Sequence, residues 1–284
     1  MAVLGRAQDG GVPHIGCDRR CCEQARLENH VELPACLGIW NRVTGARILI
    51  EATPAITTQV ALLNEIANVP SDQSNVVDAI CITHAHLGHY TGLMYLGREA
   101  SGSSELPVYV TKSMAQFLAD NEPWSQLIRG SFITPRIIDP EESFSPIDQV
   151  NIEAIVVPHR DELSDTVAFK ISGPDRTCLF CPDIDSWPSD KALMNQLFDD
   201  VDIAYVDGTF FDSSELPGRN LDLIPHPLMV QTMDQLKDLA ISKPGMIHFI
   251  HQNHTNPALH DLSVQRAIKE RGFSMAEAGE CQSL

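Results

Sequence analysis

The sequence predicts an α/β fold in which two mixed β-sheets pack face to face and helices cover their outer faces. Three observations support this prediction. Short apolar runs typical of strands alternate with amphipathic stretches typical of helices along most of the chain. In the middle, the runs Ile152–Val157, Thr166–Ile171 and Cys178–Phe180 follow one another without a helix between them, which argues against a simple doubly wound sheet. Hydrophobic residues make up 43% of the 284 positions, enough for the large core that two packed sheets require.

The strands are assigned to short runs rich in aliphatic and β-branched residues that end at polar or turn-forming positions. In chain order they are Arg47–Ile50, Asp78–Thr83, Val108–Thr111, Arg136–Ile138, Ile152–Val157, Thr166–Ile171, Cys178–Phe180, Ile203–Val206 and Met246–Ile250. Helices are assigned where apolar residues recur three or four positions apart. They are Ile56–Ala67, Thr91–Arg98, Ser113–Asp120, Lys191–Phe198, Leu228–Ala240 and Ser263–Arg271. We expect loops at Ser101–Glu105 and Glu141–Pro146, and a tight turn at Gly10 and Gly11.

We expect one domain over residues 1–284, because no internal repeat and no long linker rich in proline, glycine or serine divides the chain. The first residues lack the charged and apolar regions of a secretory signal, and no apolar run reaches the roughly 18 residues of a membrane span. We therefore expect a cytoplasmic protein whose eight cysteines are thiols or metal ligands rather than disulfides.

The charge of the chain bears on its partners. A formal net charge of −18 disfavours general nucleic-acid binding, because phosphates are bound by lysine and arginine. We expect a small-molecule substrate instead, and a small anion is compatible because a bound metal ion outweighs nearby carboxylates locally. No membrane partner is expected, and a homodimer is left open.

Three histidines follow the apolar strand Ile80–Ile82. His84 and His86 are two positions apart on an extended segment, so both imidazoles project to one side, and His89 reaches back from the turn. This spacing in the segment THAHLGH indicates a metal site at the end of a strand. The alternative is a polar loop in which the histidines occur by chance.

Other candidate ligands also follow strands. His159 comes after the run ending at Val157, Asp183 after Cys178–Phe180, and His251 after the run ending at Ile250. A single residue of this kind is more often a hydrogen-bonded polar group of the core than a ligand. Because four strand ends carry such residues, we expect the side chains to meet at one edge of the sheets.

The segment THAHLGHYTGL resembles the HxHxDH signature of the metallo-β-lactamase superfamily, and His159, Asp183 and His251 match its later ligand positions in order and approximate spacing. This resemblance implies a four-layer αββα sandwich. The segments AQDGGVPHIGC, ATPAI, GHYTGL, DGTFF and FIHQNHTNP are more closely similar to the pyrroloquinoline quinone biosynthesis protein B family and its unassigned relatives. The chain also resembles the cyclic phosphodiesterase family of the carbon-phosphorus lyase pathway. Together these resemblances cover almost the full length.

The resemblance implies two metal-ligand sets. The implied ligands are His84, His86 and His159 in the first set, His89 and His251 in the second, and Asp183 as the bridge between them. Gly88 departs from the signature, which has a metal-ligating aspartate there, so the second set is expected to keep two histidines and one carboxylate at most. Such a site suits one or two Zn²⁺ ions and equally a 2-His-1-carboxylate iron, and Mn is also compatible.

Catalytic roles are implied for Asp183, through the metal, and for His254. His254 lies three residues after His251 and resembles the histidine with which some phosphodiesterases of the superfamily protonate the leaving oxygen. The alternative is a histidine that only supports the ligands or faces solvent.

A second metal site is expected near the N-terminus, in a loop at residues 16–36. The spacing of Cys17, Cys21 and Cys22 is a weak signal by itself. The cyclic phosphodiesterases that the chain resembles carry a Cys3His structural zinc with a histidine from late in the chain, and His226 stands at the matching place. Three reduced thiols in a loop are the alternative. The other cysteines are expected to be core or incidental residues; these are Cys36, Cys81, Cys178, Cys181 and Cys281.

The leading functional prediction is a zinc-dependent hydrolase of a small phosphodiester or similar ester, because a metal-bound water attacks such bonds at neutral pH. The second is an iron-dependent hydroxylase of the pyrroloquinoline quinone biosynthesis protein B type, acting on a tyrosine-derived precursor through His89, Asp183 and His251. The third is a catalytically weak accessory or carrier protein, which the loss of a ligand at Gly88 would allow. Retention of His84 and His86 favours hydrolysis.

Overall fold

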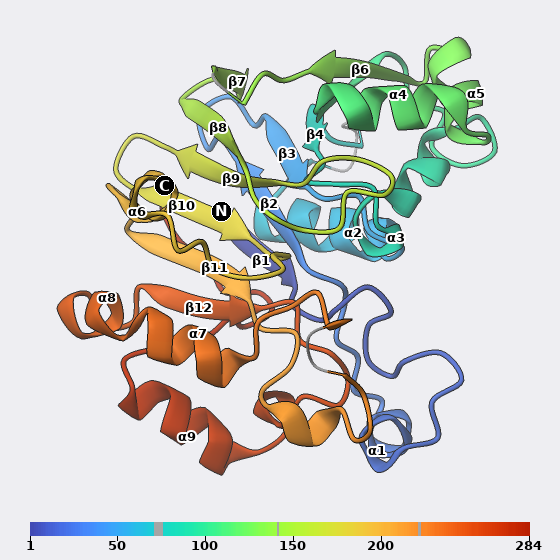
Figure 1. Cartoon of the computed structure of the whole chain (residues 1–284). Coiled ribbons are helices and arrows are strands. Elements are labelled where there is room, and N and C mark those ends of the chain that lie inside the picture. Colours follow the sequence, from blue (N-terminus) through green and yellow to red (C-terminus); the bar gives the residue numbers. More distant parts are fainter. Residues whose placement is uncertain (71–75, 141, 221–222) are drawn as a thin grey trace.

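The computed structural model describes residues 1–70, 76–140, 142–220 and 223–284. Its strands form two mixed sheets (Figure 1). The first sheet contains, in spatial order, β1 (Ala2–Gly5), β2 (Cys36–Trp40), β3 (Arg47–Ile50), β4 (Ala79–Cys81), β5 (Leu106–Val110) and β6 (Ile133–Ile137). The second contains β13 (Ser274–Met275), β12 (Ile247–Ile250), β11 (Ile203–Asp207), β10 (Thr177–Cys181), β9 (Val167–Ser172), β8 (Val150–Val156) and β7 (Ser143–Ile147).

Strand direction determines which loops meet. In the first sheet, β1, β2 and β3 pair antiparallel and β3 to β6 pair parallel, so β1 runs in the same direction as β3 and β4. In the second sheet, β7 to β10 pair antiparallel and β10 to β13 pair parallel, so β8 runs with β10, β11 and β12. The carboxyl ends of these strands therefore gather at one edge of each sheet.

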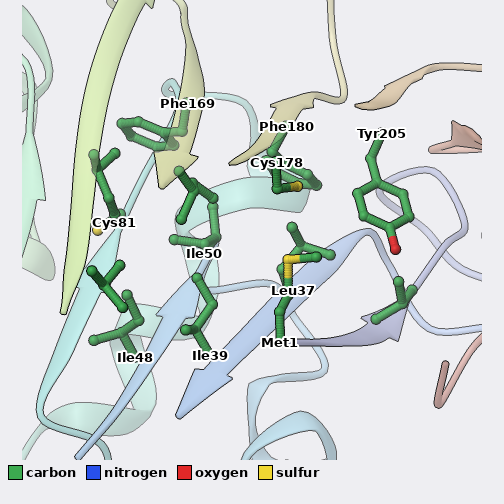
Figure 2. Packing of buried hydrophobic residues seen from close by; sticks show 14 of the residues in the cluster. Met1, Leu37, Ile39, Ile48, Ile50, Cys81, Phe169, Cys178, Phe180 and Tyr205 are labelled. Carbon is green, nitrogen blue, oxygen red and sulfur yellow. The ribbon is translucent and has the colours of Figure 1, made fainter. Parts of the chain in front are cut away.

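The main core lies between the two sheets (Figure 2). Ile48 and Ile50 of β3 point into it, while Leu49 between them packs on the opposite face, as the two-residue repeat of a strand requires. Cys178 and Cys181 likewise lie on opposite faces of β10, because they are three positions apart on one strand. Burial of each such aliphatic side chain contributes about 1.5–3 kcal/mol.

Helices cover the outer faces. The first sheet is covered mainly by α2 (Ile56–Ile66), η1 (Thr91–Leu96), α4 (Lys112–Asp120) and α5 (Trp124–Arg129). The second is covered by α6 (Lys191–Phe198), α7 (Met229–Gln235), α8 (Lys237–Ser242) and α9 (Leu262–Glu270). The predicted order of helix, sheet, sheet and helix is thus confirmed. No helix in the described part of the chain is both long and apolar enough to cross a membrane.

Several expected boundaries differ from the structure. The helix expected at Thr91–Arg98 is a 3₁₀ segment, η1, preceded by the short α3 (Leu87–Tyr90). At its start, Gly92 lies so close to the Thr53 carbonyl that a Cβ would meet the oxygen at 2.1 Å. The expected Leu228–Ala240 helix divides into α7 and α8. β7 forms in the expected loop Glu141–Pro146, whose first residue lies outside the described residues; a proline is tolerated there because β7 is an edge strand.

Some elements were not expected at all. These are β1, β2, β13, α5, α1 (Arg20–Glu28), η2 (Ser213–Glu215) and η4 (Pro257–Leu259). In α1 the buried residues are Cys22 and Ala25, so its sequence carries little of the apolar repeat that predicts a helix.

Candidate metal centre

The predicted ligands meet where the two sheets present their strand ends. β4 leads to His84, His86 and His89, β8 to His159, β10 to Asp183, and β12 to His251. The part of the chain that the structure describes brings their ligand atoms into overlapping groups, each compact enough for one ion. Because strand ends are rigid, the positions of these ligands do not depend on the conformation of a long loop.

The first group contains His84, His86, His159 and Asp183. His86 Nδ1 lies 3.0 Å from His84 Nε2 and 3.2 Å from His159 Nε2. Asp183 Oδ2 lies 3.2 Å from His84 Nε2. A tetrahedral Zn²⁺ with bonds of about 2.0–2.1 Å to nitrogen and oxygen sets ligand-to-ligand edges of about 3.3 Å. The donor atoms therefore fit a zinc-sized cation.

Neighbouring groups turn the histidine lone pairs toward this point. The Thr83 hydroxyl donates to Glu51 Oε1 at 2.5 Å, so its oxygen must accept from His84 Nδ1, 2.8 Å away. Nε2 of His84 is then unprotonated and faces the group. His159 does the same, because its Nδ1 donates to Asp185 Oδ1 at 3.0 Å. Burial also lowers the pKa of His84 and His86, which keeps both rings neutral as ligands require.

The second group surrounds His89. Its Nε2 lies 2.9 Å from Asp183 Oδ2 and 3.4 Å from Asp9 Oδ1, and its Nδ1 lies 3.2 Å from Glu51 Oε1. Despite these short distances, neither ring nitrogen makes a hydrogen bond of good geometry within the described residues. A buried imidazole whose nitrogens face acid oxygens without directed hydrogen bonds fits a bound cation better than a proton network.

Asp9 corrects the expectation drawn from Gly88. The second set was expected to have one carboxylate at most, but Asp9, on the loop after β1, places Oδ1 3.2 Å from His251 Nε2. Burial alone would raise the pKa of Asp9, yet the imidazoles of His251 and His89 beside it hold that pKa well below its usual range. The carboxylate is therefore ionised, as a metal ligand must be.

His226 is in this centre and not in the cysteine cluster, which corrects the predicted structural-zinc ligand. Its Nδ1 donates to Asp207 Oδ2 at 2.8 Å and lies 3.6 Å from Asp183 Oδ1. Its ring lies 5.4 Å from that of His159 and 6.0 Å from that of His251, measured between centroids. Burial disfavours its charged form, but the Asp207 carboxylate raises the pKa of His226 to about 9.

The cysteine cluster contains His254 instead, so the predicted catalytic position of His254 is also wrong. Its Nδ1 lies 3.7 Å from Cys17 Sγ, 3.6 Å from Cys21 Sγ and 3.4 Å from Cys22 Sγ. Zinc bonds of about 2.3 Å to sulfur and 2.1 Å to nitrogen set tetrahedral edges of about 3.6 Å. Burial, together with the neighbouring thiols of Cys17 and Cys21, raises the pKa of Cys22 to about 11. A bound cation would stabilise the thiolate forms that burial and the neighbouring thiols disfavour.

Solvent reaches the centre from one side. The side chains of His84 and His89 are each 1% exposed and that of His251 is 2% exposed. In contrast, His86 is 24% exposed, Asp9 40% and Asp185 42%. The exposed side of the centre is therefore formed by His86 and by the loops that carry Asp9 and Asp185.

Sequence reasoning missed three acids that support the site: Asp9, Glu51 and Asp185. For a fourth, Asp207, the sequence allows either a supporting role in the site or an ordinary turn at a strand end. Glu51 directly follows β3 and Asp207 ends β11, so the rule that found the other strand-end residues also applies to them. Glu51 and His251 have positive φ values of 81° and 65°, which residues other than glycine rarely adopt. The structure accepts this strain at one candidate ligand, His251, and at Glu51, whose carboxylate faces another, His89.

Comparison with known proteins identifies the family of the chain. Residues 46–251 match the family described as "Beta-lactamase superfamily domain". The chain is 22% identical over 309 aligned residues to coenzyme PQQ synthesis protein B of Rhizobium meliloti, covering 98% of this chain and 96% of that protein.

Two solved structures share the fold. Zn²⁺-bound PqqB from Methylobacterium extorquens has a TM-score of 0.83 at 18% identity and covers 100% of this chain and 99% of that one. A diphosphatase of the PhnP family has a TM-score of 0.71 at 20% identity and covers 98% and 94%, respectively. At these identities the structural likeness bears on the fold alone.

Proposed function

Because the chain belongs to the beta-lactamase superfamily and has the metallo-β-lactamase fold, we propose that it is a metal-dependent hydrolase that cleaves a small phosphodiester or similar ester. The position of Asp183 carries the proposal. Its Oδ2 lies 3.2 Å from His84 Nε2 and 2.9 Å from His89 Nε2, so one carboxylate joins two sets of ligands. Divalent metal ions bound there would supply an activated water and neutralise charge on the substrate.

The residues assign themselves to two ions by distance. His84, His86, His159 and Asp183 would hold the first. His89 and His251, which lie close together beside Asp9, would contribute to the second, and Asp183 Oδ2, 2.9 Å from His89 Nε2, would join the two. Asp185 and the Glu51–Thr83 pair keep the ligand nitrogens unprotonated. These supports are part of the site, since loss of a residue that orients a ligand typically weakens metal binding by about 10–100-fold.

His226 is the residue we propose for proton transfer. Asp207 holds its Nδ1 and is itself fixed by Thr209, whose backbone N and hydroxyl donate to Asp207 Oδ1 at 2.9 Å and 2.8 Å. Nε2 of His226 is then the nitrogen that exchanges a proton. In hydrolysis, the water oxygen bonds to the phosphorus or acyl carbon, the bond to the leaving oxygen breaks, and that oxygen takes the proton from His226 Nε2. The proton that the water releases reaches solvent, and His226 takes a proton back from solvent before the next turnover.

The test begins with protein stripped of metal and reloaded with Zn²⁺ or Mn²⁺, then assayed against cyclic and linear phosphodiesters, lactones and β-lactams. We expect turnover of at least one phosphodiester only after reloading. His226→Ala should keep its metal and slow alkyl leaving groups by about 100-fold or more, but nitrophenyl leaving groups much less. His260→Ala, at an exposed histidine, is the matched control. Absence of turnover across the panel would contradict the function; equal slowing across leaving groups would contradict the role of His226.

We also propose a structural zinc at Cys17, Cys21, Cys22 and His254. The three sulfurs come from the loop after Asp9 and from α1, whereas His254 comes from the loop after β12. An ion between them would join two segments that are far apart in the sequence.

A second candidate function is oxidative. It is favoured by the full-length similarity to coenzyme PQQ synthesis protein B and by His89, Asp183 and His251, which form a set of two histidines and one carboxylate. It predicts oxygen consumption by the Fe²⁺-loaded protein with a precursor of that cofactor. A turnover that needs Fe²⁺ and O₂, and that Zn²⁺ inhibits, would replace the hydrolase proposal.

A further inference from the structure

We infer that Asp9 is a ligand of the second metal ion and takes the place of the aspartate that the HxHxDH signature carries at position 88. The inference deepens the proposed function and rests on it. The carboxylate would then reach the metal centre from the loop after β1, outside the histidine motif and some eighty residues before it in the sequence. Two observations, one of space and one of hydrogen bonding, support it independently.

The first observation is that Asp9 fills the space a side chain at position 88 would need. A Cβ built on Gly88 would lie 2.2 Å from Asp9 Oδ1, 2.5 Å from its Cγ and 2.6 Å from its Cα. Real Cβ atoms do not approach other heavy atoms this closely, and the Asp9 backbone cannot yield as a flexible side chain would. The observed position of Asp9 therefore requires a glycine at position 88.

The second observation is the hydrogen bonding of His251. Its Nδ1 lies 3.1 Å from the Thr209 hydroxyl oxygen and 3.1 Å from Asp183 Oδ1. Because the Thr209 hydroxyl donates to Asp207 Oδ1, both of these oxygens accept, and Nδ1 is the nitrogen that carries the hydrogen. A neutral His251 therefore has its lone pair on Nε2, which faces Asp9 Oδ1 at 3.2 Å. Two lone pairs at this distance repel each other. The contact is favourable only with a second proton on the ring or a cation between the two atoms, and the experiment below separates these cases.

Backbone contacts hold Asp9 in register with His251. Gln8 N donates to the Gln252 carbonyl at 2.8 Å, and Gln252 N donates to the Arg6 carbonyl at 3.0 Å. The turn then closes through a bond of 2.7 Å from Gly11 N to the Gln8 carbonyl, and Gly11 adopts the positive φ of 64° that this turn requires. The carboxylate is thus presented by a fixed turn and not by a free loop.

The inference is tested by moving the carboxylate. The variants are Asp9→Gly, Gly88→Asp and the double variant, with Asp18→Asn as a control that removes one negative charge from an exposed position on the same loop. Metal content is measured by elemental analysis, and affinity by titrating stripped protein with Mn²⁺ and Co²⁺. We expect Asp9→Gly to lose one metal equivalent and to bind the second ion at least about 100-fold more weakly, a loss no smaller than that caused by removing a residue that only supports a ligand.

Gly88→Asp alone should lower the thermal midpoint and also lose metal, because the new side chain collides with Asp9. The double variant should recover the second equivalent and much of the affinity, since it restores the arrangement of the signature. Asp18→Asn should match the parent in metal content and affinity.

Full metal content and parental affinity in Asp9→Gly would overturn the inference, as would a folded double variant that binds no better than either single variant. If the double variant does not fold, the affinity of Asp9→Gly decides alone. These readouts do not depend on turnover. A protein that holds both ions through Asp9 but hydrolyses no substrate would contradict the proposed function and leave the ligand assignment intact.

Discussion

The metal centre and the cysteine cluster differ in what holds their ligands in place. In the metal centre, most ligands follow the largely buried strands β4, β10 and β12. The rings of His84 and His159 are oriented by hydrogen bonds that they donate to Thr83 and Asp185, and Glu51 in turn accepts from Thr83. In the cysteine cluster, the sulfurs come from a loop and from α1, of which only Cys22 and Ala25 are buried. The two sheets hold the ligands of the metal centre in place, whereas the cysteine cluster has few buried residues around it.

This difference predicts what an ion at each of the two proposed sites would do. Removal of metal from the centre should leave the fold in place, because the strand ends remain packed. Removal of an ion from the cysteine cluster should release residues 13–31, which the Val12–Glu32 bridge closes into a loop, because few buried apolar contacts hold that segment. The two sites therefore give opposite predictions. Loss of metal from the metal centre should abolish activity and leave the fold intact, whereas loss of the ion from the cysteine cluster should disorder a segment and affect activity less.

The largest expected effect is that of His86→Ala. Removing a nitrogen that lies 3.0 Å and 3.2 Å from its two neighbours should empty the first set and reduce hydrolysis by about 1,000-fold or more. The thermal midpoint should change by only a few degrees, since His86 is partly exposed. Glu162→Gln, whose exposed carboxylate lies 3.9 Å from His86, is the control and should retain its metal. A His86→Ala protein with full metal content and turnover would remove His86 from the site.

The cysteine cluster is tested by the double variant Cys17→Ser and Cys21→Ser. It should lose one zinc equivalent, and the amides of residues 13–31 should lose protection in hydrogen exchange while strand amides keep theirs. Because Asp9 is continuous with this segment, affinity for the second active-site ion should also fall, by less than in Asp9→Gly. Cys281→Ser, at an exposed thiol, is the control. Unchanged zinc in the double variant would show that the cluster holds no ion.

Much of the fold and of the first ligand set could be predicted from the sequence because the signals are local. Buried strands of the sheets read as short aliphatic runs, and the ligands stand directly after them. The fold prediction was therefore confirmed even where helix ends were wrong. The elements that were missed carry weak patterns: β1 is short, and α1 is mostly polar.

The sequence could not predict that His226 lies in the metal centre and His254 in the cysteine cluster, because these positions depend on the conformation of the loop after His251. After His251, Asn253 N donates to the Thr209 carbonyl at 2.9 Å, and Asn256 Nδ2 donates to the Gly208 carbonyl at 2.8 Å. These bonds fold the loop back on itself so that His254 faces the N-terminal cysteines. Spacing in the sequence gives no sign of this turn. Asp9 was missed for the same reason, since its place depends on pairing with Gln252.

The smallest expected effect concerns Glu32, which fastens the N-terminal segment without metal. Its carboxylate is 4% exposed and accepts from Arg6 Nε at 2.9 Å. Burial alone would raise the pKa of Glu32, but the hydrogen bonds and charge of Arg6 hold it below its usual range. A depressed pKa contributes stability above the unfolded value of about 4.3 and loses it as the pH falls through the folded value. Glu32→Gln should therefore cost about 1.5–3 kcal/mol at pH 7, and the difference from the parent should shrink toward pH 3 in urea unfolding. Glu28→Gln, at an exposed glutamate of α1, should follow the parent at every pH. A constant difference between Glu32→Gln and the parent would mean that packing, and not the ion pair with Arg6, is what Glu32 contributes.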